Sequence, residues 1–371
     1  MTDATPAASR YGRIVEAIAN DIRQGRYTVG SPCPSLSQLM RRFSVSRMTA
    51  LRAVDELKRQ GLLVARRGKG LFVTRMARML GGALGLISPG LCYAEVFPPI
   101  CQTLVRLVQR DGMNFFLDDV AADDPRTRAE RAVALARRFV SERVLGVFFQ
   151  PVEHLREAER VNREILSILD AAGIPVVLLD SDVVPSPDRS AYDLAGINNF
   201  DAGRRLSRHL VERGVRHIGF VHRKYCDFSV RNRFEGIRSV CLDAGVRVTG
   251  LDLNPADAKA VRRALARHPT VDAVICRNDC QAAHLLVSLR NLGLRVPDDL
   301  AVAGFNDMAY AATAWPSLTT IRIPSEDIAC SAYELMRTRL ASPGLPPREC
   351  YLPAELVVRE STQRPDARIV R

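Results

Sequence analysis

Residues 35–73, SLSQLMRRFSVSRMTALRAVDELKRQGLLVARRGKGLFV, contain two helix starts separated by a short turn. Ser35 followed three residues later by Gln38 is a capping-box pattern, which predicts the start of a helix. Ser46 can cap the next helix, which Gly61 ends. The second of these helices places three apolar residues on one face: Ala50, Val54 and Leu57. The spacing predicts a helix-turn-helix unit.

The flanking residues extend this unit in both directions. Upstream, Ile14, Ile18 and Ile22 recur every four residues, which predicts an earlier helix with a buried face. Downstream, the apolar runs 62–64 and 71–73 enclose a basic, glycine-containing segment and predict a hairpin. Three helices followed by a basic hairpin are typical of a winged helix-turn-helix. We therefore expect residues 1–74 to form a DNA-binding domain.

The net charge of +12 is concentrated in this segment. Residues 1–82 hold 15 Lys/Arg against 5 Asp/Glu, whereas residues 83–371 hold 38 against 36. A basic small domain on a nearly neutral large one indicates a polyanionic partner, and we expect double-stranded operator DNA. The alternative is a solvated basic tail, which the helical pattern of the segment disfavours.

The candidate DNA contacts lie at the start of the second helix of the unit and on the hairpin tip. Side chains in the first turn of such a helix reach base edges, and Arg47 suits guanine. Cations on a hairpin suit phosphates or the minor groove. The expected contacts are Ser35, Ser46, Arg47, Met48, Thr49, Arg52, Arg66, Arg67, Gly68 and Lys69. The alternatives are a helix cap for Ser35, a surface ion pair for Arg47 and plain solvation for Arg52 and the hairpin cations.

Residues 11–73 resemble the GntR-type DNA-binding head, most clearly in the run VSRMT at 45–49 and in the segment from Gly61 to Val73. Two residues depart from that family's pattern. Ser37 stands where the family usually has part of an acidic-Arg pair, and Leu51 stands where it often has Arg or Lys. Leu51 could instead pack on a thymine methyl group. These departures leave the operator sequence open.

Beyond a junction at 75–82, apolar runs alternate with amphipathic helical stretches up to residue 362. The predicted strands are 84–87, 115–117, 144–149, 176–179, 218–221, 273–276 and 300–305, and the predicted helices are 99–110, 128–140, 157–171, 203–213, 234–244, 256–266 and 281–292. This alternation indicates an α/β fold with doubly wound parallel sheets, in which ligands bind beyond the carboxyl ends of the strands. We expect residues 83–362 to be a ligand-sensing domain and 363–371 a tail.

Polar residues directly follow several of these strands. The candidate effector contacts are Ser88, Gln150, Asp180, Arg233, Asn278 and Asn306. Together they could pair with vicinal hydroxyls. The alternatives are helix caps or turns for Asp180 and Asn278, an ion pair for Arg233 and plain loop packing for Ser88 and Gln150. Asp307, next to Asn306, is interpreted as a turn former. Trp315 is either a stacking wall or a core residue. No catalytic triad, GxGxxG or Walker motif occurs, so we expect no enzyme.

Residues 83–362 resemble the effector domain of the LacI/GalR repressors, whose two-lobed fold is shared with periplasmic sugar-binding proteins. The resemblance rests on segments including SVRNRFEGIRSVCLDAG at 229–245 and LGLRVPDDLAVAGFND at 292–307. It implies that residues matching Asp180, Arg233, Asn278 and Asn306 hold a sugar. The family usually has Asp where Asn306 and Asn198 stand. The amide at Asn306 therefore changes the expected hydrogen-bond pattern.

A GntR-type head on a LacI/GalR-like body is similar to the arrangement of the arabinose repressors of Gram-positive bacteria. We expect a homodimeric repressor whose operator affinity is controlled by a carbohydrate bound between two lobes. The alternatives are a non-sugar metabolite, a transport-associated sugar-binding protein and a pyridoxal-phosphate enzyme fusion. The last would need a Schiff-base lysine, and only Lys224 and Lys259 follow residue 82.

The remaining expectations concern location and chemistry. The N-terminus lacks a signal-peptide pattern and no run of 18 apolar residues occurs, so we expect a cytoplasmic protein without a membrane segment. The nine cysteines include no CxxC pair, and we expect them to be reduced, with no metal and no cofactor.

Overall fold

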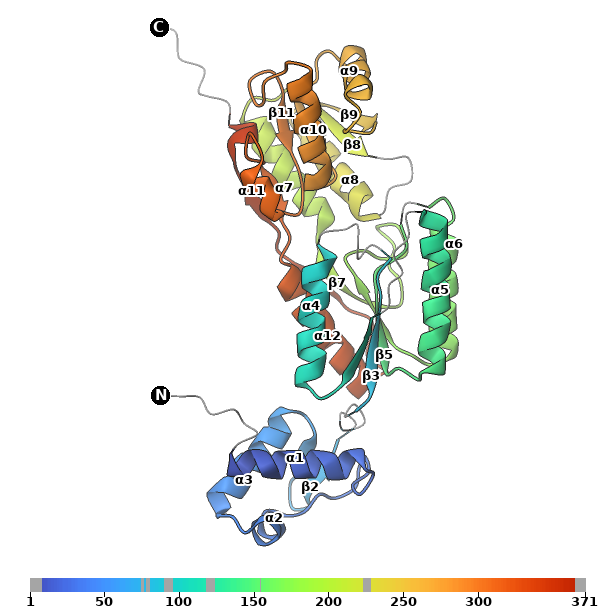
Figure 1. Cartoon of the computed structure of the whole chain (residues 1–371), viewed down its shortest axis with the longest axis vertical. Coiled ribbons are helices and arrows are strands. Elements are labelled where there is room, and N and C mark those ends of the chain that lie inside the picture. The colour runs from blue at the N-terminus through green and yellow to red at the C-terminus, as the bar shows by residue number, and fades with distance from the viewer. Residues whose placement is uncertain are drawn as a thin grey trace.

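The computed structural model describes residues 9–74, 77, 81–89, 96–117, 124–153, 155–222 and 228–363. It consists of a small head followed by two α/β lobes stacked along the long axis of the molecule, with lobe 1 between the head and lobe 2 (Figure 1). Most of the junction 75–82 and all but the first residue of the tail 363–371 lie outside the described residues. None of the helices in the described ranges is long and apolar enough to cross a membrane.

The head has the winged helix-turn-helix fold that the sequence predicts. Its elements are α1 (Arg10–Arg23), α2 (Leu36–Phe43), α3 (Arg47–Arg59), β1 (Leu63–Arg66) and β2 (Gly70–Val73). The capping box is present, because the Ser35 hydroxyl accepts from the Gln38 amide N–H while the Gln38 side chain accepts from the Ser35 N–H. The antiparallel hairpin closes with Arg66 opposite Gly70. Gly68 and Gly70 have φ values of 71° and 96°, which favour glycine at this tip.

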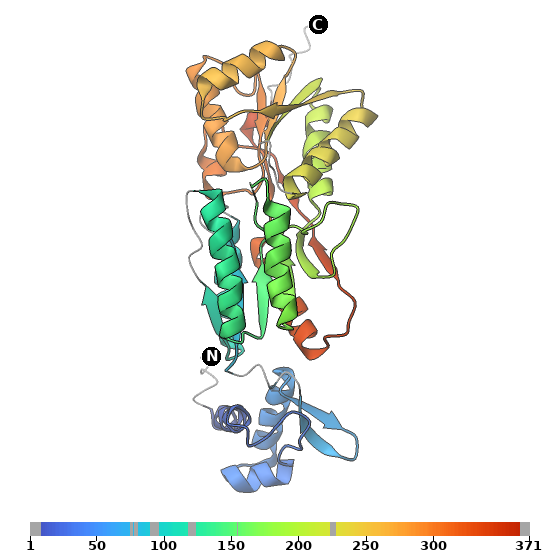
Figure 2. The same cartoon turned by 90° about the vertical axis from the view of Figure 1, so that its right-hand side faces the viewer.

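Lobe 1 is a parallel sheet covered by helices on both faces. Its elements are β3 (Ala83–Ile87), α4 (Phe97–Arg110), β4 (Asn114–Leu117), α5 (Pro125–Ser141), β5 (Gly146–Phe149), α6 (Ala158–Ala171), β6 (Val176–Leu179), β7 (Asp193–Ile197), α12 (Ser325–Ala341) and β13 (Glu349–Leu352). The strand order is β13-β7-β6-β5-β3-β4 and all described pairs are parallel. Helices α4 and α12 cover one face, and α5 and α6 lie side by side on the other (Figures 1 and 2).

Lobe 2 repeats this architecture with a smaller sheet. Its elements are α7 (Asn199–Glu212), β8 (His217–His222), α8 (Phe228–Asp243), β9 (Arg247–Asp252), α9 (Ala258–Arg267), β10 (Ala273–Cys276), α10 (Asp279–Asn291), β11 (Ala301–Ala303), α11 (Ala309–Thr313), β12 (Thr320–Arg322), β14 (Glu355–Val357) and the 3-10 helix η3 (Glu360–Thr362). The parallel strand order is β11-β10-β8-β9. Buried residues of α7 and α8 pack on one face and those of α9 and α10 on the other.

The chain passes between the lobes three times, from β7 to α7, from β12 to α12 and from β13 to β14. Next to the last two crossings, β12 and β14 pair antiparallel. The predicted strands and helices are present with shifted ends. The elements that were not predicted are β7, β9, β12, β13, β14, α11, α12 and η3. The buried strand β7 carries Asp193 and Gly196, so its residues do not form an uninterrupted apolar run.

Candidate DNA-binding surface and effector site

The first turn of α3 combines a capped helix start with exposed side chains. The Ser46 hydroxyl accepts from the Thr49 amide N–H at 3.3 Å and lies 3.0 Å from the Thr49 hydroxyl. Arg47 and Met48 are exposed beside this cap. Amide groups at a helix start carry partial positive charge, which favours a phosphate. The structure therefore brings Ser46, Arg47, Met48 and Thr49 together on one exposed surface.

The predicted DNA-contacting arginines differ in what they touch. The Arg52 guanidinium lies over the Tyr11 ring at 4.6 Å, and that of Arg66 lies over the Phe72 ring at 4.6 Å. Arg47 makes no side-chain hydrogen bond or ion pair with any residue in the described part of the chain. Arg67 and Lys69 are exposed at the hairpin tip. Stacking holds Arg52 and Arg66 in place, whereas Arg47 is available to a partner.

Asp21 is a buried carboxylate of the head that was not predicted from the sequence, and it forms two ion pairs. Asp21 pairs with Arg26 at 2.8 Å and with Arg42 at 2.6 Å, and its own side chain is buried. The hydrogen bond from Arg42 to Asp21 raises the pKa of that guanidinium. Burial raises the pKa of the nearby Cys33 thiol to about 12. Because the pair joins α1 to α2, part of the basic charge of the head serves its fold.

In lobe 1, the three candidate effector residues follow three neighbouring strands. The buried Ser88 hydroxyl donates to the Gln150 side-chain oxygen at 2.5 Å, which joins the ends of β3 and β5. Asp180 follows β6, has a φ of 69° and donates its amide N–H to the Ala195 carbonyl oxygen at 2.9 Å. A side chain in place of Gly196 would come within 2.9 Å of the Asp180 carbonyl oxygen. The structure therefore places these residues along one edge of the sheet.

In lobe 2, Arg233 is 5% exposed and is held by three groups. Its Nε donates to the Asn199 side-chain oxygen and its Nη1 to the Arg277 carbonyl oxygen, both at 2.8 Å. Its guanidinium lies over the Phe305 ring at 4.6 Å.

Two glycines allow α7 and α8 to cross closely enough to present Arg233. A Cβ atom at Gly203 would lie 2.1 Å from the Arg233 carbonyl oxygen, and one at Gly236 would lie 2.0 Å from the Phe200 carbonyl oxygen. No side chain fits at such distances, because real contacts of a Cβ atom are longer. The tight crossing therefore fixes the backbone that carries Arg233.

Asn278 and Asn306 lie at the ends of β10 and β11. The Asn278 side chain caps α10, accepting from the Gln281 amide N–H at 3.0 Å, which is the structural role weighed above. Asn306 has a φ of 112° and donates its amide N–H to the Ile321 carbonyl oxygen at 2.8 Å. Asparagine is among the few non-glycine residues that tolerate a positive φ.

The neighbouring Asp279 is a buried carboxyl group that was not among the effector residues predicted from the sequence. It accepts from the Thr320 hydroxyl at 2.7 Å and from the Met308 amide N–H at 2.9 Å. Burial raises the pKa of Asp279 to about 7, and the nearby Asp307 carboxylate acts in the same direction. The hydrogen bonds from Thr320 and Met308 oppose this rise. Asp279 thus links the start of α10 to β12.

Asp307, which the sequence suggested as a turn former, also carries an ion-pair network. Its carboxylate accepts from Arg322 Nε at 2.7 Å and from Arg359 Nη2 at 2.6 Å. Arg322 also donates to Glu355 at 2.7 Å. Because Arg322 lies on β12 and Glu355 on β14, the residue next to Asn306 is connected to the two strands beside the lobe crossings.

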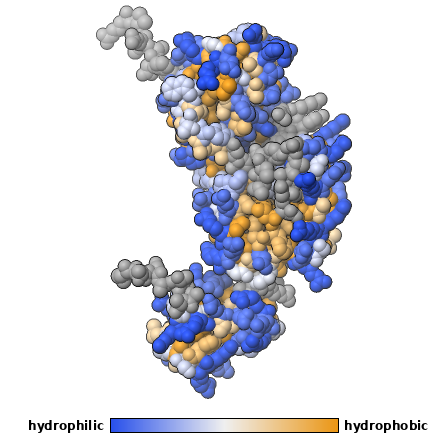
Figure 3. Space-filling view, in the orientation of Figure 1, coloured by the Kyte–Doolittle hydropathy of each residue, from blue (hydrophilic) through white to orange (hydrophobic). Residues whose placement is uncertain are grey.

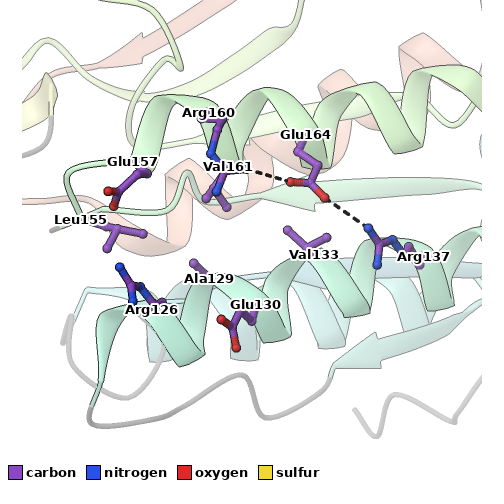
Figure 4. Close-up of a pocket in the computed structure, with 10 residues that line it drawn as sticks. All are labelled: Arg126, Ala129, Glu130, Val133, Arg137, Leu155, Glu157, Arg160, Val161 and Glu164. Atoms are coloured by element: carbon purple, nitrogen blue, oxygen red, sulfur yellow. Dashed lines mark hydrogen bonds and ion pairs between the residues drawn. The ribbon is translucent and has the colours of Figure 1, made fainter.

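Two other features lie outside this arrangement. Trp315 is 81% exposed, so it is not a core residue in this chain, and its interpretation as a stacking wall stays a prediction. A groove between α5 and α6 on the outer face of lobe 1 is lined by three arginines, three glutamates and four apolar residues (Figure 4). Glu164 pairs there with Arg137 at 3.2 Å and with Arg160 at 3.4 Å. Much of the groove's charge is therefore paired internally.

Comparison with known families assigns both parts of the chain. Residues 10–73 match the bacterial regulatory proteins of the gntR family, and residues 207–362 match the periplasmic binding protein-like domain. The chain is 26% identical to the ribose operon repressor of Halalkalibacterium halodurans, over 84% of this chain and 87% of that protein. It is 24% identical to the arabinose metabolism transcriptional repressor of Geobacillus stearothermophilus, over 95% of this chain and 98% of that protein.

Solved structures agree with these matches. The transcription regulator GntR from Chromobacterium violaceum is 28% identical, with a TM-score of 0.61, and the match covers 76% of this chain and 99% of that one. The transcriptional regulator CelR in complex with cellobiose is 22% identical, with a TM-score of 0.63 and coverage of 97% and 100%. The second likeness shows that the whole chain shares that regulator's fold.

Proposed function

We propose that the chain, which joins a GntR-type DNA-binding head to a periplasmic-binding-protein-like domain, is a carbohydrate-responsive transcriptional repressor. The observation that carries the proposal is the coexistence of two polar surfaces. One is the exposed start of α3, which carries Arg47, together with the basic hairpin, and the other is the set of polar groups at the strand ends of both lobes.

On the head, the proposed DNA contacts are those expected from the sequence. The start of α3 enters the major groove, where Arg47 pairs with a base edge. Arg66, Arg67 and Lys69 contact the backbone from the hairpin, and Gly68 allows its close approach. Ser35, Ser46 and Thr49 combine capping with contacts to phosphate.

In the sensor, we propose that the effector binds between the lobes. Asp180, Arg233, Asn278 and Asn306 supply donors and acceptors that suit neighbouring hydroxyl groups. Ser88 and Gln150 extend the set in lobe 1. Relatives named for ribose and arabinose and a structural neighbour holding cellobiose support a carbohydrate. A non-sugar metabolite is the competing class.

We propose that the protein acts as a homodimer. Figure 3 shows an apolar area on lobe 1, over α4 and the edge strand β4. Leu117 on β4 is 45% exposed, and this strand ends the sheet. An apolar surface at an unpaired sheet edge favours association with a second copy. Lobe closure by the effector would then change the spacing of two heads and lower operator affinity.

The proposal is tested by selecting duplexes from a random library with the purified full-length chain, then adding sugars to the complex. We expect one enriched sequence with two half-sites, released by at least one mono- or disaccharide. Light scattering should give the mass of a dimer. Failure to enrich any sequence would contradict operator binding, and release only by non-carbohydrate metabolites would contradict the effector class.

A further inference from the structure

Two large apolar side chains are exposed on the surface of α3 that carries Arg47. Met48 is 72% exposed and Leu51 is 37% exposed. The opposite face of the helix holds the residues that it buries in the head: Ala50, Ala53, Val54 and Leu57. Met48 and Leu51 are therefore not needed for the core, and their exposure requires another explanation.

We propose that Met48 and Leu51 read thymine methyl groups in the major groove of the operator. This inference rests on the proposed function and specifies the chemistry that the head recognises. The thymine methyl is an apolar group on a major-groove edge that otherwise presents donors and acceptors. Leucine has no donor or acceptor, and the methionine sulfur is only a weak acceptor. These two side chains therefore distinguish bases by apolar contact.

The spacing of the two residues suits neighbouring base pairs. Positions three apart share a helix face. They are separated by about 4.5 Å along the helix axis at 1.5 Å per residue, and successive base pairs rise by about 3.4 Å. Arg47, directly before Met48, can pair with a guanine beside these thymines. The predicted half-site therefore contains a guanine next to one or two thymines on the bases that α3 faces.

The surroundings favour DNA over an apolar protein partner. The exposed pair adjoins Arg47 and the amide groups at the start of α3, both of which attract an anion. The segment 1–82 carries a balance of +10 from its 15 basic and 5 acidic residues. An apolar protein surface would have to desolvate these cations without pairing them, which is costly.

The test removes the methyl group without altering base pairing. The duplex enriched by the full-length chain is synthesised with thymine and again with deoxyuridine at every thymine, and both are titrated in gel shifts at one salt concentration. Burial of one methyl group corresponds to about a fourfold change in affinity. We expect a loss of about 15-fold for an operator with one contacted thymine in each of two half-sites.

Variants separate this contact from a change in DNA shape. In the double variant Met48→Ala/Leu51→Ala, the two duplexes should bind within about twofold of each other, and selection should no longer enrich the same thymines. Leu242→Ala is the matched control, because Leu242 is exposed on lobe 2, and it should retain the full sensitivity to deoxyuridine.

Equal affinity of the unaltered protein for both duplexes would overturn the inference. So would a deoxyuridine effect that persists in the double variant, since the effect would then come from DNA shape. If Met48 and Leu51 instead bind a protein, substituting them would leave the DNA affinities unchanged, and that result would also overturn the inference. If no duplex is enriched at all, the proposed function itself fails, and the two failures are therefore distinguishable.

Discussion

Arg47 in the head and Arg233 in lobe 2 are the cations on which the two proposed activities most depend, and their surroundings are opposite. Arg47 is exposed and has no side-chain partner among the residues described. Arg233 is buried and is held by Asn199, the Arg277 carbonyl and the Phe305 ring. Arg47 is therefore solvated in the free protein, whereas Arg233 already makes its hydrogen bonds within the folded lobe.

This difference predicts separate consequences for stability and binding. A solvated arginine contributes little to folding, and its contacts with DNA are weakened by salt. A buried arginine that satisfies protein acceptors contributes to folding and is preorganised for a ligand, because its rotamer is fixed before binding. Substitutions in the sensor should therefore change stability, and substitutions at the start of α3 should change DNA affinity alone.

The largest effect is expected for Arg233→Ala. The substitution leaves the Asn199 oxygen and the Arg277 carbonyl without this donor and opens a space beside Phe305, so the free energy of unfolding should fall by about 3–5 kcal/mol. Urea unfolding followed by circular dichroism measures this change. Arg231→Ala is the control, since Arg231 is exposed and, among the residues that the structure describes, contacts only the Phe228 ring, at 5.3 Å. If the two variants were equally stable, Arg233 would contribute no more to folding than an exposed arginine, and it would not differ from Arg47 in this respect.

Asp279 should make the stability of the sensor depend on pH. Its pKa is raised to about 7 from an ordinary 3.8, so between these values the folded protein holds a proton that the unfolded chain has released. Stability therefore falls as pH rises from 4 to 7, by about 4 kcal/mol at most, and this contribution is constant above 7. Asp279→Asn should flatten the profile of unfolding free energy against pH. Asp257→Asn, at the exposed cap of α9, should keep it, and a slope retained in both variants would contradict the assignment.

Arg47→Ala should reduce specific operator affinity without changing stability. Loss of one bidentate base contact corresponds to about 1–3 kcal/mol for each half-site. Gel shifts with the selected operator at fixed salt measure the loss, and thermal unfolding should be unchanged. Arg59→Ala, at the other end of α3 and paired with Glu56, is the control. Unchanged affinity in the Arg47 variant would refute the assigned orientation of α3.

The sequence predicted most accurately those features that local patterns determine. Ser35 and Gln38 form the predicted capping box, and Ser46 begins α3 as expected, because caps depend on residues three apart. Features that depend on distant partners were missed. The pairing of Asp21 with Arg42 needs α1 and α2 to pack together on α3, and the raised pKa of Asp279 needs the folded lobe to bury its carboxyl group. The candidate effector residues were proposed because strand ends meet at one edge of a parallel sheet, and their role in binding stays a prediction.

Arg52 is intermediate between Arg47 and Arg233, because it is exposed but its guanidinium also contacts an aromatic ring of the head. Its guanidinium lies over Tyr11 at 4.6 Å, so Arg52→Ala should lower the free energy of unfolding by about 0.5–1 kcal/mol. A guanidinium that stacks through its face can still donate through its edge to phosphate. The slope of log affinity against log salt should therefore also fall, by about 0.9 for each head.

Lys69→Ala should give the same change of slope without loss of stability, because Lys69 lies at the exposed hairpin tip. An unchanged slope for Arg52→Ala would restrict this residue to holding α3 against α1, and the phosphate contacts of the head would then come from unstacked cations.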